Sequence, residues 1–76
     1  MITETLDTKG LNCPLPILKT KKAIAKLAGG ETLEVLSTDP GSAQDFEAFA
    51  HATGHKIVEA EEAGGVFRFL IEKKAG

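Results

Sequence analysis

The sequence predicts an α+β fold, a two-layer sandwich in which two helices cover one face of a four-stranded sheet. Two observations predict this fold. Segments with strand and helix patterns follow one another in the order β-α-β-α-β-β within 76 residues, which is the length of one small domain (1–76). Each strand–helix–strand crossover is expected to be right-handed, and two crossovers that step in the same direction leave both helices on one face.

The first strand and the first helix come from residues 3–30. Residues 3–8 are rich in threonine and predict a short strand. The helix should begin at about Pro14, because proline is tolerated in the first helical turn, and should end at Gly29-Gly30. The predicted buried face is Ile17, Thr20, Ala23, Ile24, Leu27 and Ala28, and the opposite face carries Lys19, Lys22 and Lys26.

A second strand–helix pair occupies residues 31–54. Residues 31–38 predict a strand with Leu33 and Val35 on one face. The Asp-Pro-Gly-Ser stretch at 39–42 starts a helix that runs to about Thr53 and stops at Gly54. Its predicted buried face is Ala43, Phe46, Phe49, Ala50 and Thr53.

The C-terminal third predicts a hairpin. Residues 55–61 and 66–73 form its strands, residues 62–65 form its turn, and Phe67, Phe69 and Ile71 face the core. This topology brings the loop with Cys13, the loop with Asp39 and the hairpin turn to the same end of the sheet. Asp39 is therefore expected on the same rim as Cys13.

Composition excludes several classes of protein. A single cysteine excludes an intramolecular disulfide, a cysteine-rich zinc site and a Cys-x-x-Cys redox pair. No apolar run has the length of a membrane span and no secretory signal opens the chain, so a free thiol indicates a reducing compartment, the cytoplasm. The net charge of −2 argues against direct nucleic-acid binding. Neither a membrane partner nor a bound cofactor is expected, and a monomer is the expected state.

Cys13 is the sharpest candidate for chemistry. It lies in a loop beside Asn12, just before the helix and next to Pro14 and Pro16. The positive end of the helix dipole favours a thiolate there, and the two prolines stiffen the loop and remove backbone donors. The alternative is a small buried hydrophobic residue, which is common for free cysteine but does not suit a loop position outside the apolar stripe.

The residues around Cys13 suggest a contact surface for a partner. Leu11, Leu15 and Leu18 have little use in the predicted core, so they could form an apolar collar around the thiol or a contact patch. Lys19 and Lys22 lie close enough to the helix start to steer an acidic partner or an anionic sulfur donor. The alternative for the lysines is an ordinary solvated helix face.

Asp39 is open to two interpretations. It can cap the second helix with Pro40 at the first helical position, although Ser42 is an alternative cap. Close to Cys13, its carboxylate would oppose thiolate formation, or as an acid it could relay a proton. His51 and His55 are expected on the surface. No metal site is expected, because neither histidine is accompanied by other residues that bind metals.

The whole chain resembles the TusA (SirA-like) sulfur-carrier family. The likeness rests on Gly10-Leu11-Asn12-Cys13-Pro14-Leu15-Pro16 with its Cys-Pro-x-Pro motif, the lysine-rich helix, Gly-Gly-Glu, Asp39-Pro40, Asp45-Phe46 and Gly54-His55. The resemblance implies a mixed sheet of order 1-2-4-3 with an antiparallel fourth strand, similar to the C-terminal domain of translation initiation factor three.

The resemblance also implies a function. Cys13 would accept sulfane sulfur as a persulfide and pass it to a downstream protein; Pro14 and Pro16 are motif residues and Asp39 is a motif acid of unclear role. The donor would be a cysteine desulfurase or a rhodanese, and the sulfur would serve tRNA thiolation, molybdenum-cofactor assembly or cytoplasmic sulfur oxidation. The Gly-Leu-Asn-Cys-Pro-Leu-Pro-Ile and Asp-Pro-Gly-Ser stretches look closer to members linked with sulfur oxidation than to the others.

The resemblance implies a sulfurtransferase-like carrier more than an enzyme with its own small-molecule substrate, and whether the chain is itself an enzyme stays open. The lack of a second cysteine suits a carrier, because no internal thiol can resolve the persulfide into a disulfide. The main alternative is a regulatory or protein-binding module in which the cysteine is not essential. Two further alternatives are weaker. A thiol peroxidase would need a second thiol to resolve the oxidised Cys13, and a metallochaperone would need more ligands than one thiol and two histidines.

Overall fold

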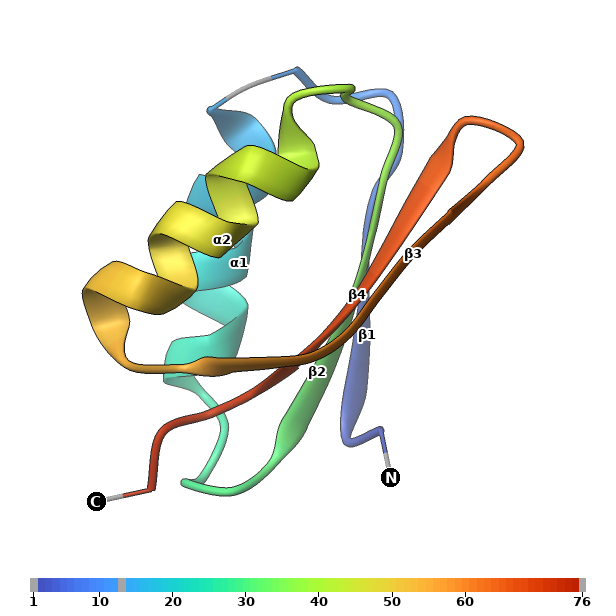
Figure 1. The fold of residues 1–76 in the computed structure, drawn as a ribbon. Coiled ribbons are helices and arrows are strands. Elements are labelled where there is room, and N and C mark those ends of the chain that lie inside the picture. Colours follow the sequence, from blue (N-terminus) through green and yellow to red (C-terminus); the bar gives the residue numbers. More distant parts are fainter. Residues whose placement is uncertain (1, 13, 76) are drawn as a thin grey trace.

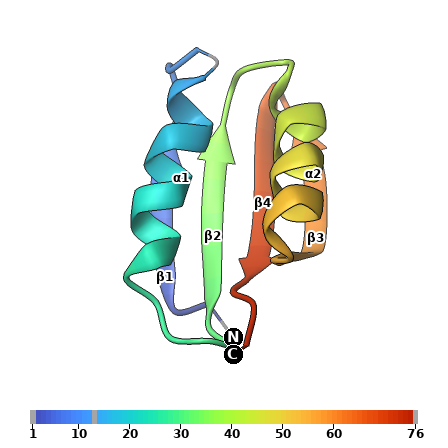
Figure 2. The same ribbon diagram turned by 90° about the vertical axis from the view of Figure 1, so that its left-hand side faces the viewer.

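The computed structural model describes residues 2–12 and 14–75 and has the predicted two-layer architecture (Figure 1). The sheet has the order β1-β2-β4-β3; β1 is parallel to β2, and the β2–β4 and β3–β4 pairs are antiparallel. Figure 2 shows α1 over β1 and β2 and α2 over β4 and β3, which confirms the expected fold class and strand order. The elements are β1 (Glu4–Thr8), α1 (Leu15–Ala25), β2 (Thr32–Ser37), α2 (Ser42–Thr53), β3 (Lys56–Ala63) and β4 (Val66–Glu72).

The core lies between the helices and the inner face of the sheet. Because side chains alternate along a strand, every second residue of β2 and β4 faces the helices. Leu33 and Ile71 are fully buried there, as predicted. Phe46 of α2 packs on Phe69 of β4 with ring centroids 4.7 Å apart. This face of the sheet carries the apolar burial that holds so small a domain together.

Helix α1 ends earlier than the sequence predicts. Its last residue is Ala25, so the expected end at residues 29–30 is wrong, and Ala28 is exposed although the pattern placed it on the buried face. A distant side chain explains the early stop. The Nζ of Lys73 donates hydrogen bonds to the carbonyl oxygens of Ala25 (3.3 Å) and Leu27. A lysine here satisfies carbonyls that the helix leaves unpaired and complements the negative end of its dipole.

Helix α2 buries a narrower face than predicted. Phe46 and Phe49 are buried as expected, but Ala43 and Thr53 are exposed. Both lie at the margins of the contact with the sheet: Ala43 lines a pocket beside β3, and Thr53 lines a groove beside α1. The helix ends as predicted at Gly54, whose φ of 85° is the left-handed conformation that glycine adopts without strain.

The hairpin is tighter than the predicted turn at 62–65. Strand β3 continues to Ala63, which pairs with Val66, so the turn is only Gly64-Gly65. Both glycines have positive φ, 59° and 82°, as the two-residue hairpin turn requires. A register shift between Ile57 and Glu59 interrupts the pairing of β3 with β4.

Candidate functional site

The loops after β1 and β2 meet at one end of the sheet. The N–H of Gly10 donates to Oγ1 of Thr38 at 2.9 Å, which joins the two loops directly. The hairpin turn between β3 and β4 lies at the same end, as predicted (Figure 1). Cys13 belongs to the first loop but lies outside the described residues. Its neighbours Asn12 and Pro14 are both exposed, so the chain on either side of Cys13 is open to solvent.

The start of α1 matches the predicted position. Pro14 is the N-cap residue, and no described side chain caps the helix. The N–H of Leu15 donates to the carbonyl oxygen of Asn12 at 2.8 Å, which links the start of the helix to the preceding loop. Pro16, the second helical residue, is buried. The positive end of the helix dipole therefore points into the loop, where it favours an anion.

Asp39 lies in the neighbouring loop and is partly buried. Its Oδ1 accepts a hydrogen bond from the N–H of Gly41 at 3.2 Å, and its own N–H donates to Oγ of Ser37 at 3.2 Å. The N-cap residue of α2 is Gly41, so both predicted caps, Asp39 and Ser42, are wrong. Asp39 instead closes a short turn one residue before the helix, a common use of aspartate.

The side chain of Ser42 points into the protein and contacts a second buried hydroxyl, that of Ser37. The hydroxyls of Ser42 and Ser37 form a hydrogen bond inside the protein, with the two oxygens 2.5 Å apart. Both side chains are at most 1% exposed. This contact occupies the hydroxyl that would otherwise cap α2, and it ties the start of α2 to the end of β2.

The three leucines around the loop form a partly exposed group, here named the leucine patch (Leu11, Leu15 and Leu18). Leu15 is 45% exposed and Leu18 is 46% exposed, while Leu11 is half-buried. Lys19 and Lys22, on the same helix, are exposed. The pattern correctly indicated that the core does not use these leucines fully, and their role in partner binding stays a prediction.

A groove between the two helices was missed by sequence analysis. It has a volume of about 310 Å³ and begins at Pro14, beside the loop. Lys21 of α1 and Asp45 of α2 flank a floor that is mainly apolar, and small residues leave the space open. The spacing of Ala48 and Ala52 on α2 was the available signal, since residues four apart share one helix face. The full lining is Pro14, Ile17, Lys21, Asp45, Ala48, Phe49, Ala52 and Thr53.

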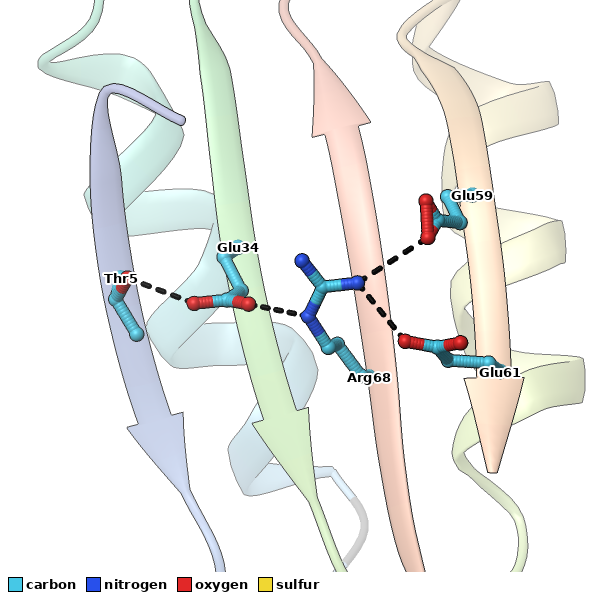
Figure 3. A network of polar contacts seen from close by, with 5 residues as sticks. All are labelled: Thr5, Glu34, Glu59, Glu61 and Arg68. Carbon is cyan, nitrogen blue, oxygen red and sulfur yellow. Dashed lines mark hydrogen bonds and ion pairs between the residues drawn. The ribbon is translucent and has the colours of Figure 1, made fainter. Parts of the chain in front are cut away.

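The outer face of the sheet carries a polar network that was also missed (Figure 3). Arg68 of β4 forms ion pairs with Glu34 of β2 and with Glu59 and Glu61 of β3, the last two at 3.2 and 2.9 Å. Thr5 of β1 donates to Glu34 at 2.9 Å. The hydrogen bonds from Arg68 and Thr5 lower the pKa of Glu34. The hydrogen bond with Glu34 is the largest effect on the pKa of Arg68 and raises it; burial comes next and opposes the rise, and the hydrogen bond with Glu61 adds to it. All four strands contribute, so the network braces the sheet and not the cysteine loop.

The two histidines differ. His51 is exposed as predicted, but His55 is partly buried and packs on Phe49 with ring centroids 5.8 Å apart. Its Nδ1 accepts a hydrogen bond from the N–H of Lys74 at 2.9 Å. Burial, and then the charges of Lys73 and Lys74, lower the pKa of His55. This histidine therefore fastens the C-terminal segment to the end of α2.

Residues 2–12 and 14–75 offer neither a metal site nor a membrane-spanning helix. That part of the chain contains no group of three or more His, Cys, Asp or Glu side chains arranged to hold a metal ion. It also contains no helix that combines the length and the apolar character needed to cross a membrane.

Comparison with known proteins connects this geometry to a family. The family described as "Sulfurtransferase TusA" matches residues 4–73. The sulfur carrier protein TusA of Allochromatium vinosum is 53% identical over 70 residues, 92% of each chain. The sulfur carrier protein TusA of Pseudomonas entomophila is 39% identical over 71 residues, 93% of this chain and 89% of that protein.

A solved structure agrees in fold. The crystal structure of a SirA-like protein from Desulfitobacterium hafniense superposes with a TM-score of 0.81 and 32% sequence identity, covering 93% of this chain and 97% of the other. The match in sequence spans nearly all the described elements, and the match in structure covers the same two layers. The chain therefore belongs to the TusA sulfurtransferase family, whose members include sulfur carrier proteins.

Proposed function

We propose that this protein carries sulfane sulfur as a persulfide on Cys13 and exchanges it with a donor protein and an acceptor protein. The observation that carries the proposal is the family match over residues 4–73, with relatives that are sulfur carrier proteins. The site supports it in two ways. A hydrogen bond from the N–H of Leu15 to the carbonyl oxygen of Asn12 links the loop to the start of α1, and Asn12 and Pro14 are both exposed. Cys13 is also the only thiol of the chain.

The proposed chemistry is thiol–persulfide exchange. The Cys13 thiolate attacks the outer sulfur of the donor persulfide, the donor S–S bond breaks, and the donor cysteine leaves as a thiolate. In the second half, an acceptor thiolate attacks the outer sulfur on Cys13, and the Cys13 thiolate leaves. Each step forms one bond to sulfur and breaks one, so no external oxidant or reductant is needed. The N-terminal end of α1 stabilises the thiolate in both steps.

The donor is proposed to be a cysteine desulfurase or a rhodanese, and the acceptor a protein thiol in the cytoplasm, where free thiols stay reduced. The leucine patch and the neighbouring Lys19 and Lys22 are the proposed contact surface for these proteins. Exposed apolar side chains beside basic ones suit a short-lived complex with an acidic partner. Asp39 lies in the loop after β2, next to the loop that contains Cys13. We propose that it holds its own loop in position at this end of the sheet.

The first experiment is intact-mass spectrometry after incubation with a cysteine desulfurase and cysteine, or with a rhodanese and thiosulfate. The wild-type protein is expected to gain the mass of one sulfur atom, and a reductant should remove it. Cys13→Ala should gain none. If no donor adds sulfur while the thiol still reacts with an alkylating reagent, the carrier role of Cys13 is overturned and a binding module becomes the better description.

A second experiment tests the contact surface with a matched pair. Leu18→Glu should slow persulfide formation from the protein donor by about tenfold, since it puts a charge into an apolar contact. Val58→Glu is the control, because Val58 is 45% exposed, against 46% for Leu18, but lies on β3. Equal slowing by both substitutions would remove the leucine patch from the proposal.

A further inference from the structure

A second groove runs between α1 and the edge of the sheet. It has a volume of about 230 Å³ and lies on the far side of α1 from the groove shared with α2. Strand β1 contributes Glu4 and Leu6, and the helix contributes Ala23 together with Lys19, Lys22 and Lys26. Three lysines against one glutamate give this groove, here named the edge groove, a net positive charge.

These lysines outnumber the single carboxylate of their groove and stay unpaired within the described chain. None of Lys19, Lys22 and Lys26 forms an ion pair with any residue among 2–12 and 14–75. Helix α1 contains no acidic residue at all. Lysines spaced three and four apart on one helix face repel each other and weaken the helix slightly. The arrangement is therefore suited to a negative group supplied from outside.

The floor of the edge groove is a strand with a free side. Strand β1 pairs only with β2, so it is an outer strand of the sheet. An outer strand directs half of its backbone N–H and C=O groups away from the sheet, where another extended segment can pair with them. Figure 2 shows α1 lying over β1, so side chains of an added strand on the helix side would lie beneath the lysines.

We propose that an extended acidic segment of a partner protein docks in the edge groove, pairs with the free edge of β1 and places its carboxylates against Lys19, Lys22 and Lys26. The acidic residues must alternate, because only every second side chain of the added strand faces the helix. Asp7 on the other face of β1 disfavours acids at the intervening positions. The same strand leads at its carboxyl end into the cysteine loop, so the docked segment would end beside that loop.

This inference rests on the proposed function only in taking the partner to be the sulfur donor or acceptor. Binding to β1 can be measured on the reduced protein with no sulfur source present. A failed persulfide assay would then leave the edge groove untouched, and a failed binding assay would leave the carrier role untouched.

The test is NMR titration of the full-length ¹⁵N-labelled protein with a capped seven-residue peptide in which glutamate and threonine alternate. The backbone amides of residues 4–8 and 19–26 should shift together. A peptide with lysine in place of glutamate should not bind. A peptide with proline at its central position should bind at least about fivefold more weakly, because proline removes a backbone donor.

A matched pair of charge changes sharpens the test. Lys19→Glu with Lys22→Glu should weaken binding of the acidic peptide by at least about tenfold at 0.15 M salt. Lys21→Glu is the control, because Lys21 is on the same helix but lines the groove with α2; it should change affinity less than about twofold. Lys19→Gln with Lys22→Gln replaces the first variant if that variant unfolds.

Four results would overturn the proposal. They are shifts confined to the groove between the helices, an equal loss of affinity in Lys21→Glu, equal binding of the proline peptide, or no binding at millimolar peptide. The same measurements distinguish two other ligands of the edge groove, a second copy of this chain and RNA. Concentration-dependent self-association lost in the double variant would identify a second copy, whose β3 carries Glu59, Glu61 and Glu62. If a uridine decanucleotide bound the same residues more tightly than the acidic peptide does, RNA would be the ligand of the edge groove.

Discussion

The two faces of the sheet are built from the same strands but do different work. The inner face is closed by helices and contains fully buried Leu33, Val35 and Ile71. The outer face is open to solvent, and its centre is Arg68 among three glutamates. Burial on the inner face accounts for most of the stability, while the ion pairs of the outer face make part of it depend on pH. Substitutions on the two faces should therefore differ in size and in pH dependence.

The largest effect is expected on the inner face at Phe46. This ring is fully buried and packs on Phe69. Phe46→Ala removes that burial and leaves a cavity, so it should lower the free energy of unfolding by about 3–5 kcal/mol. Urea unfolding followed by circular dichroism measures the loss. Arg68→Gln on the outer face is the comparison, and an equal loss there would contradict the division between the faces.

A smaller effect of opposite sign is expected at Thr20. This side chain of α1 is fully buried, and its hydroxyl has no hydrogen-bond partner among residues 2–12 and 14–75. Thr20→Val keeps the shape and removes the unpaired hydroxyl, so the protein should gain about 1 kcal/mol. Thr8→Val is the matched control, because the equally buried hydroxyl of Thr8 donates to the carbonyl of Leu36. Thermal melts of both variants should shift in opposite directions; a parallel shift would count against this account.

On the outer face, Arg68→Gln should cause a loss well below that of Phe46→Ala, and the loss should depend on pH. The pKa of Glu34 is lowered in the folded protein, first by its hydrogen bond from Arg68 and then by that from Thr5. A lowered carboxyl pKa adds stability that is complete above the ordinary value of 4.5 and is lost as the pH falls through the lowered value. The difference between wild type and variant, measured by urea unfolding, should be largest at pH 7 and shrink in acid. A difference that is constant with pH would contradict the role of Glu34.

The smallest expected effect is a loss of stability in mild acid caused by His55. Its pKa is lowered below 6.5 by burial and by two lysines. Between the two values the unfolded chain binds a proton that the folded chain does not, so stability falls as the pH drops through this window. Protonation also removes the Nδ1 acceptor for the N–H of Lys74. Unfolding at pH 5 and 7.5 should show this dependence in wild type and not in His55→Phe; an unchanged dependence in the variant assigns it elsewhere.

Sequence analysis predicted the parts of the fold that local patterns determine. The order of elements, the alternation that buries Leu33 and Phe69, and the stop at Gly54 all depend on neighbours in the chain. The early end of α1 does not, because it depends on Lys73, which lies 48 residues beyond Ala25. The cap predicted at Ser42 failed for a different reason: its hydroxyl is hydrogen-bonded inside the protein to Ser37, only five residues away.

The candidate site was predictable only in part. The position of Asp39 on the rim of the cysteine loop follows from topology, and the exposure of Leu15 and Leu18 follows from the helical pattern. The grooves on the two sides of α1 could not be predicted, because each needs the distance between elements as well as the residues that face it. Lys21 lines the groove with α2, whereas Lys19 and Lys22 line the groove with β1. This difference depends on where α2 and β1 lie relative to α1.

The place of β1 in the sheet has a consequence for the order in which the protein opens. This strand has five residues and one neighbour, and each of its residues pairs with a residue 29 positions later in the chain, whereas β3 and β4 are adjacent in sequence. Short outer strands with distant partners form late and separate first, so amide hydrogen exchange is expected to be fastest along β1. The segment that leads into the cysteine loop is thus the part of the sheet that can loosen without unfolding the rest.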